Sequence, residues 1–198
     1  MSHGQHVHQR RLRPEDAHKL ERPERARWLP PDELLDRVGI RAGMVVADVG
    51  AGTGYFALPI ARRVGEGGRV VAIDASPEML ELLRAKLDGT SLPVELVHGE
   101  AERTGVADAC ADVVLLVNVW HEVDDRVAAA GEARRMLRSG GRLVVVDWRD
   151  DVSGPPGPPA DHRLGMGAVK TELRGWGWDV QAAEHVGEFS YLIIASAS

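Results

Sequence analysis

Short apolar runs alternate with amphipathic stretches along most of the chain from residue 44 onward. Near-continuous, valine-rich runs of this kind are typical of strands that are covered on both faces. Such strands are predicted at Met44–Val49, Arg69–Ile73, Val94–Val97, Val113–Val117 and Arg142–Val146. Helices are predicted between them at roughly 55–64, 77–87 and 124–138, the last one ended by Gly140 and Gly141. The alternation predicts an α/β fold with a doubly wound, mainly parallel sheet.

The first 39 residues follow a different pattern. Two short helical patterns begin near Pro14 and Pro23, since proline is tolerated in the first turn of a helix. Asp32 is the predicted N-cap of a third helix, and Gly39 is predicted to end it. These helices are expected to form a cap or lid over 14–39.

On either side of these helices, the chain is predicted to consist of an N-terminal tail and one domain. Residues 1–13 are rich in His, Gln and Arg and are predicted to be a flexible tail, and 40–198 are predicted to form the main domain. A loose metal site in the tail is the less favoured alternative to incidental histidines. The histidines concerned are His3, His6 and His8.

The last third of the chain departs from plain strand–helix alternation. The segment 153–159 is so rich in Pro and Gly that it is predicted to be an extended loop. A helix is predicted near 162–174, and two strand-like runs follow at Trp178–Ala182 and Phe189–Ala195. Their spacing predicts an antiparallel pair that closes the sheet.

Composition narrows the class of protein. The chain has 198 residues, of which 44% are hydrophobic and 27% charged, which are globular values. Its net charge of -6 argues against a nucleic-acid or anionic-membrane partner. The single cysteine, Cys110, excludes an internal disulfide, is expected to be a small buried residue rather than a nucleophile, and predicts a reduced, cytoplasmic protein. No metal site and no membrane span are predicted.

The first predicted strand runs into a glycine-rich segment, Gly50–Gly54. In open α/β sheets, ligands bind beyond the carboxyl ends of strands, where this loop falls. The dinucleotide fingerprint is G-x-G-x-x-G/A, but Tyr55 occupies the position that should be Gly or Ala. Asp48 would repel a pyrophosphate and suits a ligand with positive charge, such as S-adenosylmethionine.

Polar side chains also lie at or just after the ends of the next three predicted strands. Asp74 ends the second strand and can accept both hydroxyls of a ribose. Glu100 follows the third strand and can accept a hydrogen bond from an adenine amino group, and Asn118 follows the fourth. Four suitable strand ends are a stronger signal than the glycines alone.

Three segments resemble the signatures of class I S-adenosylmethionine-dependent methyltransferases: Val45–Phe56, Val71–Leu80 and Leu137–Leu143. The most similar branch is the methyltransferase type 11 group, which resembles the ubiquinone and menaquinone methyltransferases. The resemblance covers about residues 40–195. It implies a Rossmann-like sheet with strand order 3-2-1-4-5-7-6, in which the last strand is antiparallel.

The resemblance also implies which residues contact the cofactor. The glycine loop contributes Asp48, Gly50, Ala51, Gly52, Gly54 and Tyr55. The ribose and adenine sites are contributed by Asp74, Ala75, Met79, Glu100 and Ala101, and the mouth for the methyl group by Asn118. The chain departs from the family at Glu100, where Asp is common, and at Pro59, which falls inside the first predicted helix.

His121 is the candidate catalytic residue. It follows the fourth strand, near the expected methyl acceptor, and histidine titrates near neutrality. Methyl transfer needs a base only when the nucleophile must lose a proton, so His121 is alternatively a residue of the pocket wall. Asp147 and Arg149 end the fifth strand, and they either line the substrate cavity or form a surface ion pair.

The favoured hypothesis is an enzyme that transfers a methyl group from S-adenosylmethionine to a small-molecule acceptor by inline displacement. One alternative is a module that binds S-adenosylmethionine without catalysis, alone or as a partner subunit. A nicotinamide-dependent oxidoreductase is disfavoured by Tyr55 and Asp48. The sequence leaves the acceptor and the oligomeric state open.

Overall fold

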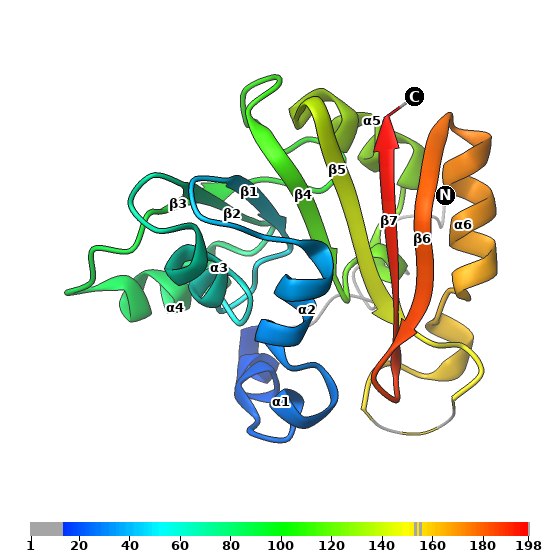
Figure 1. The fold of residues 1–198 in the computed structure, drawn as a ribbon. Helices are drawn as coiled ribbons and strands as arrows, with labels where there is room; N and C mark the ends of the chain where they lie inside the picture. Colours follow the sequence, from blue (N-terminus) through cyan, green and yellow to red (C-terminus); the bar gives the residue numbers. More distant parts are fainter. Residues whose placement is uncertain (1–13, 153, 155, 198) are drawn as a thin grey trace, which may run out of the picture.

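The structure is a computed structural model that describes residues 14–152, 154 and 156–197. Its centre is a seven-stranded sheet in the order β3-β2-β1-β4-β5-β7-β6 (Figure 1). The strands are β1 Val45–Val49, β2 Arg69–Asp74, β3 Val94–His98, β4 Ala111–Val117, β5 Leu137–Trp148, β6 Trp178–Val186 and β7 Ser190–Ala197. Strands β1 to β5 are parallel, and β7 runs antiparallel to both β5 and β6. The predicted α/β fold and strand order are confirmed.

Helices cover both faces of the sheet. One face packs against α2 Pro31–Val38, α3 Ala57–Val64 and α4 Pro77–Leu87, and the other against α5 Arg126–Met136 and α6 Met166–Gly175. Shorter helical segments are η2 Pro14–Glu21, α1 Arg25–Trp28, η3 Trp120–Glu122 and η4 Ala160–His162. In the described part of the chain, none of the helices has the length and apolar character that crossing a bilayer requires.

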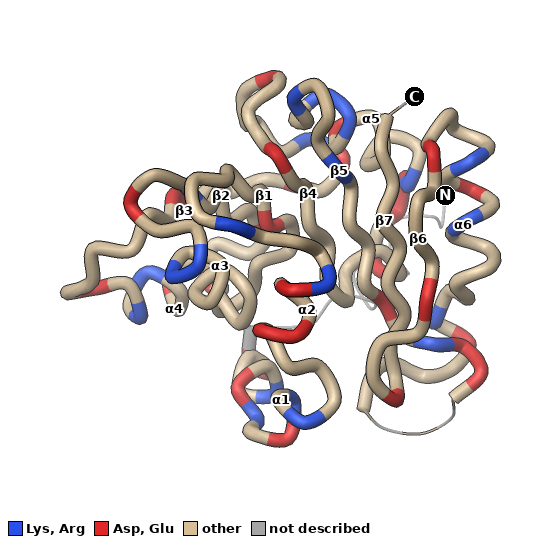
Figure 2. Tube along the Cα trace, in the orientation of Figure 1, with Lys and Arg blue, Asp and Glu red and all other residues tan. Residues whose placement is uncertain are grey.

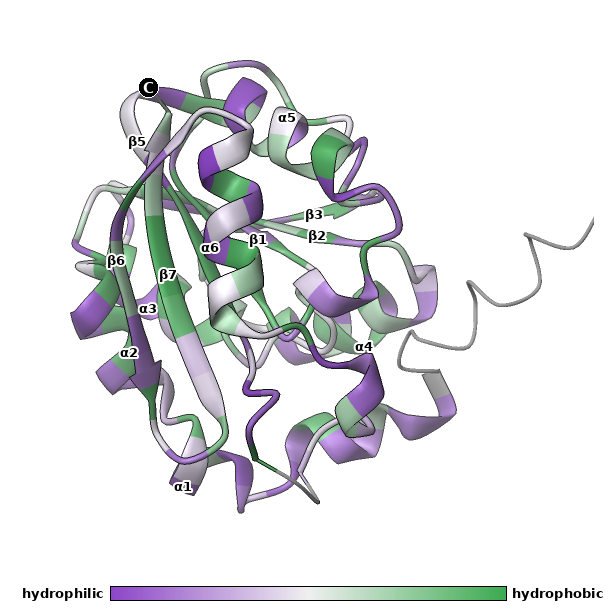
Figure 3. Ribbon diagram, turned by 90° about the vertical axis from the view of Figure 1, so that its right-hand side faces the viewer, coloured by the Kyte–Doolittle hydropathy of each residue, from purple (hydrophilic) through white to green (hydrophobic). Residues whose placement is uncertain are grey.

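Neighbouring residues of each central strand belong to different cores. Val46 packs with the α3 side and Ala47 with the α5 side, because successive side chains point to opposite faces of a strand. Much of β5 and β7 is hydrophobic, while the helices carry hydrophobic and hydrophilic residues in alternation (Figure 3). Acidic and basic residues are interspersed along the chain (Figure 2).

The junction of α5 and β5 differs from the prediction. The helix predicted over 124–138 ends at Met136, and the backbone enters β5 at once, because Leu137 pairs with Ala111 at the start of β4. The glycines therefore do not end the helix. Gly140 has a φ of 77° and lies in an irregular stretch of β5, where the pairing shifts register before it resumes at Arg142.

Two details near the amino end of the chain also differ from expectation. The N-cap of α2 is Pro30, not Asp32, because Pro31 is the first helical residue; Gly39 ends the helix with a φ of 73°, as predicted. Pro59 is the third residue of α3. The N–H groups of a first helical turn have no partner within the helix, so this proline breaks no hydrogen bond of α3.

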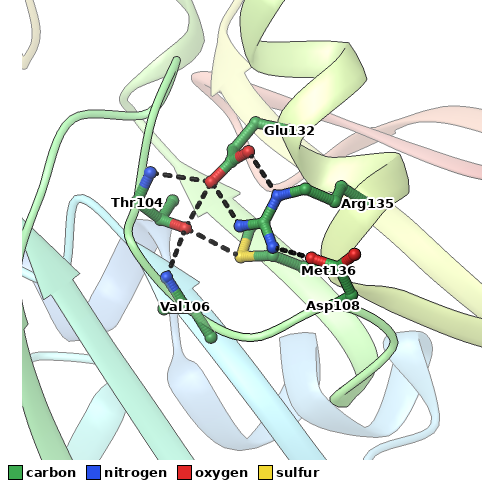
Figure 4. Close-up of polar contacts among 6 residues, drawn as sticks. All are labelled: Thr104, Val106, Asp108, Glu132, Arg135 and Met136. Atoms are coloured by element: carbon green, nitrogen blue, oxygen red, sulfur yellow. Dashed lines mark hydrogen bonds and ion pairs between the residues drawn. The ribbon is translucent and has the colours of Figure 1, made fainter.

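A polar cluster fixes the long connection between β3 and β4 to α5 (Figure 4). Glu132 Oε1 accepts hydrogen bonds from the backbone N–H of Thr104 at 2.8 Å and from its hydroxyl at 2.6 Å. Arg135 donates to both oxygens of Glu132 and also pairs with Asp108. The hydrogen bond from Arg135 is the main cause that lowers the pKa of Glu132 to about 2; burial opposes it and Thr104 adds to it.

We expect Glu132→Gln to lower the free energy of unfolding at pH 7 by about 1–3 kcal/mol, because buried donors lose a charged acceptor. Since the folded-state pKa of Glu132 is depressed, its stabilisation is present above the unfolded-state pKa near 4.5 and is lost as the pH falls towards 2. Denaturant unfolding at pH 7, 4 and 3 measures this.

The matched control is Glu81→Gln, because Glu81 pairs with Arg84 on the surface of α4 with both side chains more than half exposed. This control should change stability little at any pH. A loss in Glu132→Gln that is the same at every pH would contradict the assignment of charge to Glu132.

Candidate functional site

The glycine loop follows β1 and lies against two neighbouring segments. Gly50 has a φ of 76°, and a side chain there would overlap Val119, which follows β4. Gly54 has a φ of 88°, and its open side is filled by Leu83 of α4. A side chain at either position is therefore excluded by both backbone conformation and packing.

Asp74 connects this loop to the start of α4. Its Oδ2 accepts a hydrogen bond from the N–H of Gly52 at 2.7 Å, and its Oδ1 accepts one from the N–H of Ser76 at 2.9 Å. The Asp74 carboxylate is thereby held at the carboxyl end of β2 and lines a cavity. Carboxylate oxygens have further lone pairs that can accept hydroxyl groups of a ligand.

Asp48 is a buried acid beside the same loop. Its side chain is 2% exposed, and none of the described residues donates a hydrogen bond to its carboxylate. Burial, followed by the nearby charge of Asp74, raises the pKa of Asp48 to about 7, although Arg25 opposes the shift. A positively charged ligand would favour the ionised form of Asp48.

Asn118 supplies a second acceptor at the end of β4. It has a φ of 58°, in the left-handed region that Asn tolerates better than most residues. Its Oδ1 is buried and has no hydrogen-bond partner among the described residues. An orphaned buried acceptor and an unbonded buried acid line one cavity, so a cationic ligand head fits this site.

The cavity has a volume of about 1530 Å³, which exceeds the range common for a single small ligand. It lies beyond the carboxyl ends of the parallel strands, as predicted for an open α/β sheet. The predicted site residues that line it are Asp48, Gly50, Ala51, Gly52, Tyr55, Asp74, Ala75, Met79, Glu100, Ala101, Asn118 and His121. Gly54 is not among the lining residues, because it faces Leu83.

The N-terminal helices close one side of this cavity. Arg25 is 7% exposed, and its guanidinium lies 4.0 Å from the centre of the Tyr55 ring. Glu21 bonds to the hydroxyl of Thr53 and to Lys86, whose Nζ also donates to the carbonyl of Thr53 at 2.7 Å. These contacts join η2 and α1 to the glycine loop.

His121 lines the cavity and forms a buried pair with Asp147. Their side chains are 4% and 1% exposed, and His121 Nδ1 lies 2.7 Å from Asp147 Oδ1. Asp147 Oδ2 also accepts the backbone N–H of His121 at 2.8 Å. The surface pair considered for Asp147 and Arg149 is wrong, because Arg149 instead pairs with Asp151.

Arg163 holds the loop that follows β5. The guanidinium is buried and donates to backbone carbonyls at 2.7–3.2 Å; the acceptors are Arg149, Val152, Gly154, Pro156 and Pro158. Pro156, Gly157 and Pro158 line the cavity beside Trp148. Arg163 therefore shapes one wall of the cavity without entering it.

We expect Arg163→Lys to loosen this loop, because an ammonium group cannot reproduce the fork of guanidinium donors. Limited proteolysis should cut within 149–158 at least several-fold faster than in the wild type. The matched control, Arg149→Lys, changes an arginine of the same loop whose charged partner, Asp151, is exposed, and it should change the rate little. Equal rates for wild type and Arg163→Lys would contradict this role.

Sequence reasoning missed Arg25 and the bond between His121 and Asp147. Arg25 stands among Arg22 and Arg27, and nothing in the sequence separates the buried arginine from its exposed neighbours. The bond from His121 to Asp147 had a usable signal. Asp147 lies near the end of β5 and His121 follows the end of the adjacent strand β4, since the two strands pair up to Val117 and Val146.

Known proteins with similar sequences are methyltransferases. Residues 47–145 match the family model described as "Methyltransferase domain". The chain is 42% identical to an uncharacterized methyltransferase of Mycobacterium tuberculosis over 132 residues, which are 66% of this chain and 51% of that protein. It is 35% identical to the ubiquinone/menaquinone biosynthesis C-methyltransferase UbiE of Hahella chejuensis over 116 residues, 58% of this chain and 47% of UbiE.

A solved structure covers more of the chain. The SAM-dependent methyltransferase from Aquifex aeolicus superimposes with a TM-score of 0.88 at 27% identity, covering 93% of this chain and 98% of that one. The chain spans about half the length of the curated relatives it matches.

The chain belongs to the methyltransferase domain family. The predicted resemblance to class I methyltransferases, a class that uses S-adenosylmethionine, is thereby confirmed. Among the described residues, no group of three His, Cys, Asp or Glu side chains could hold a metal ion.

Proposed function

We propose that this protein transfers a methyl group from S-adenosylmethionine to a small-molecule acceptor. The observation that carries the proposal is the pair of unbonded, buried acceptors in one cavity, Asp48 and Asn118 Oδ1. Both suit the ammonium of the methionine end. When bound, S-adenosylmethionine supplies a methyl group on a positively charged sulfur.

The other residues of the cavity fit the remaining parts of this cofactor. Arg25 is the buried cation on the wall beside Asp48, and it suits the carboxylate of the methionine end. Asp74 would accept the ribose hydroxyls, and Met79 would pack on the adenine. Ala75, Glu100 and Ala101 would meet the rest of the adenine, as the resemblance implies.

The shape of the cavity supports a small acceptor. Its volume exceeds the usual range for one small ligand, so an acceptor has room beside the cofactor. Trp28, Trp148 and the loop at Pro156–Pro158 are among the residues that line it. Along the described part of the chain, acidic and basic residues are interspersed, whereas nucleic-acid binding favours a patch or stripe of basic residues (Figure 2).

The direct test is ligand-induced stabilisation followed by turnover. S-adenosylmethionine and S-adenosylhomocysteine should each raise the midpoint of thermal unfolding, and NAD should not, because only a ligand of the folded state stabilises it. Formation of S-adenosylhomocysteine from a pool of small metabolites should follow. Stabilisation by NAD alone would overturn the proposal, and binding without turnover would support the non-catalytic alternative.

Asp48 predicts a pH dependence of cofactor binding. Its pKa in the free protein is about 7, and a neighbouring cation lowers it, so binding below pH 7 must expel a proton. Between pH 5 and 7, where the ligand's ammonium stays protonated, we expect affinity to rise with pH by up to about tenfold per unit. Titration calorimetry of S-adenosylmethionine measures this.

Asp48→Asn should bind S-adenosylmethionine more weakly and lose the pH dependence. Asp88→Asn is the matched control, because Asp88 is exposed at the end of α4 and does not line the cavity. An unchanged slope in Asp48→Asn would remove this carboxylate from the site.

A further inference from the structure

The bond between His121 and Asp147 fixes which ring nitrogen carries the proton. Asp147 Oδ1 lies 2.7 Å from His121 Nδ1 and also accepts the N–H of Trp148 at 2.8 Å. An ionised carboxylate accepts hydrogen bonds and donates none, so Nδ1 of the neutral ring holds the hydrogen. His121 Nε2 then has a lone pair, and His121 lines the cavity.

The charges around the ring favour its basic character. Burial alone lowers the pKa of His121, but the charge and hydrogen bond of Asp147 and the charge of Glu122 outweigh it, so that the pKa rises above 6.5. Arg163 acts in the opposite direction. These are the charged groups that act on His121 from η3, from β5 and from the chain after η4.

The cavity that His121 lines also has aromatic walls. The rings of Trp28 and Trp148 pack with their centres 5.2 Å apart, and both residues line the cavity. Gly157 lies so close to Trp148 that a side chain there would come within 2.8 Å of its ring. Aromatic and proline walls suit an apolar, planar ligand.

We propose that the methyl acceptor is a small aromatic alcohol of the phenol or catechol class, whose hydroxyl proton is taken by His121 Nε2 while Asp147 positions the imidazole. This inference rests on the proposed methyltransferase function. A phenol is largely protonated at neutral pH and therefore needs a base, whereas Trp28 and Trp148 give its ring an apolar surface.

The step is balanced in atoms and charge. The O–H bond breaks and its proton goes to His121 Nε2, while an oxygen lone pair forms the new O–CH₃ bond. The S–CH₃ bond breaks with its electron pair remaining on sulfur, which becomes a neutral thioether. The positive charge passes from sulfur to the imidazolium, which releases its proton to water.

The test compares two acceptors that differ in their need for a base. Catechol must lose a proton during transfer, whereas thiophenol is already ionised at neutral pH. His121→Gln should slow methylation of catechol by about 10²–10⁴-fold and that of thiophenol by less than about tenfold. A merely structural role of His121 would slow both reactions alike.

The positioning role of Asp147 is tested by a separate measurement, the pH profile of methylation. Asp147→Asn removes the charge that raises the His121 pKa, so the pH at which catechol methylation reaches half its maximum should move to lower values. Nitrogen NMR of the wild type should show the neutral His121 ring protonated at Nδ1. His185→Gln, which changes an exposed histidine of β6, is the matched control and should change neither measurement.

Calorimetry with S-adenosylmethionine on every variant separates the two proposals. If the wild type does not bind this ligand, the proposed function fails. If it binds the ligand but methylates no aromatic alcohol, or if His121→Gln slows both acceptors equally, the inference about acceptor and base is overturned. An unshifted pH profile in Asp147→Asn overturns the positioning role.

Discussion

The carboxylate of Asp74 is the contact on which the proposed cofactor site depends. It bonds to the backbone of Gly52 on one side and of Ser76 on the other, so one side chain at the end of β2 joins the loops that follow β1 and β2. Because parallel strands end at the same edge of the sheet, this bridge places Asp48 beside a second negative charge. The fold therefore builds a site in which two carboxylates share one buried guanidinium, that of Arg25.

That imbalance has an energetic meaning. Burying an ionised carboxylate without a hydrogen bond costs free energy. None of the described residues donates a hydrogen bond to Asp48, and its raised pKa reduces this cost because the protonated form carries no charge. A folded protein keeps such a group when a ligand completes its environment. The amide oxygen of Asn118 is likewise a buried acceptor without a partner among the described residues, although it carries no charge.

The sequence predicted the sheet well because its valine runs need cover on both faces, and it predicted the glycine loop because few residues fit there. It predicted the helix boundaries less well: the end of α5 at Met136 depends on a strand pairing between Leu137 and Ala111, which local propensity does not encode. The buried position of Arg25 likewise depends on how η2 and α1 fold over the glycine loop, a tertiary arrangement without a local signature.

The hydrogen bonds from Arg163 to the loop after β5 affect how the sequence of this loop can change during evolution. All of its acceptors in the loop after β5 are main-chain carbonyls, which every amino acid possesses. Apart from Gly154 and Gly157, whose positive φ angles favour glycine, side chains of that loop can therefore be exchanged without loss of these hydrogen bonds. A lineage carrying this arginine can alter this wall of the cavity in single steps, without changing the glycine loop or Asp74. In this short loop, the main chain thus maintains the structure, while the side chains are available to change the shape of the cavity wall.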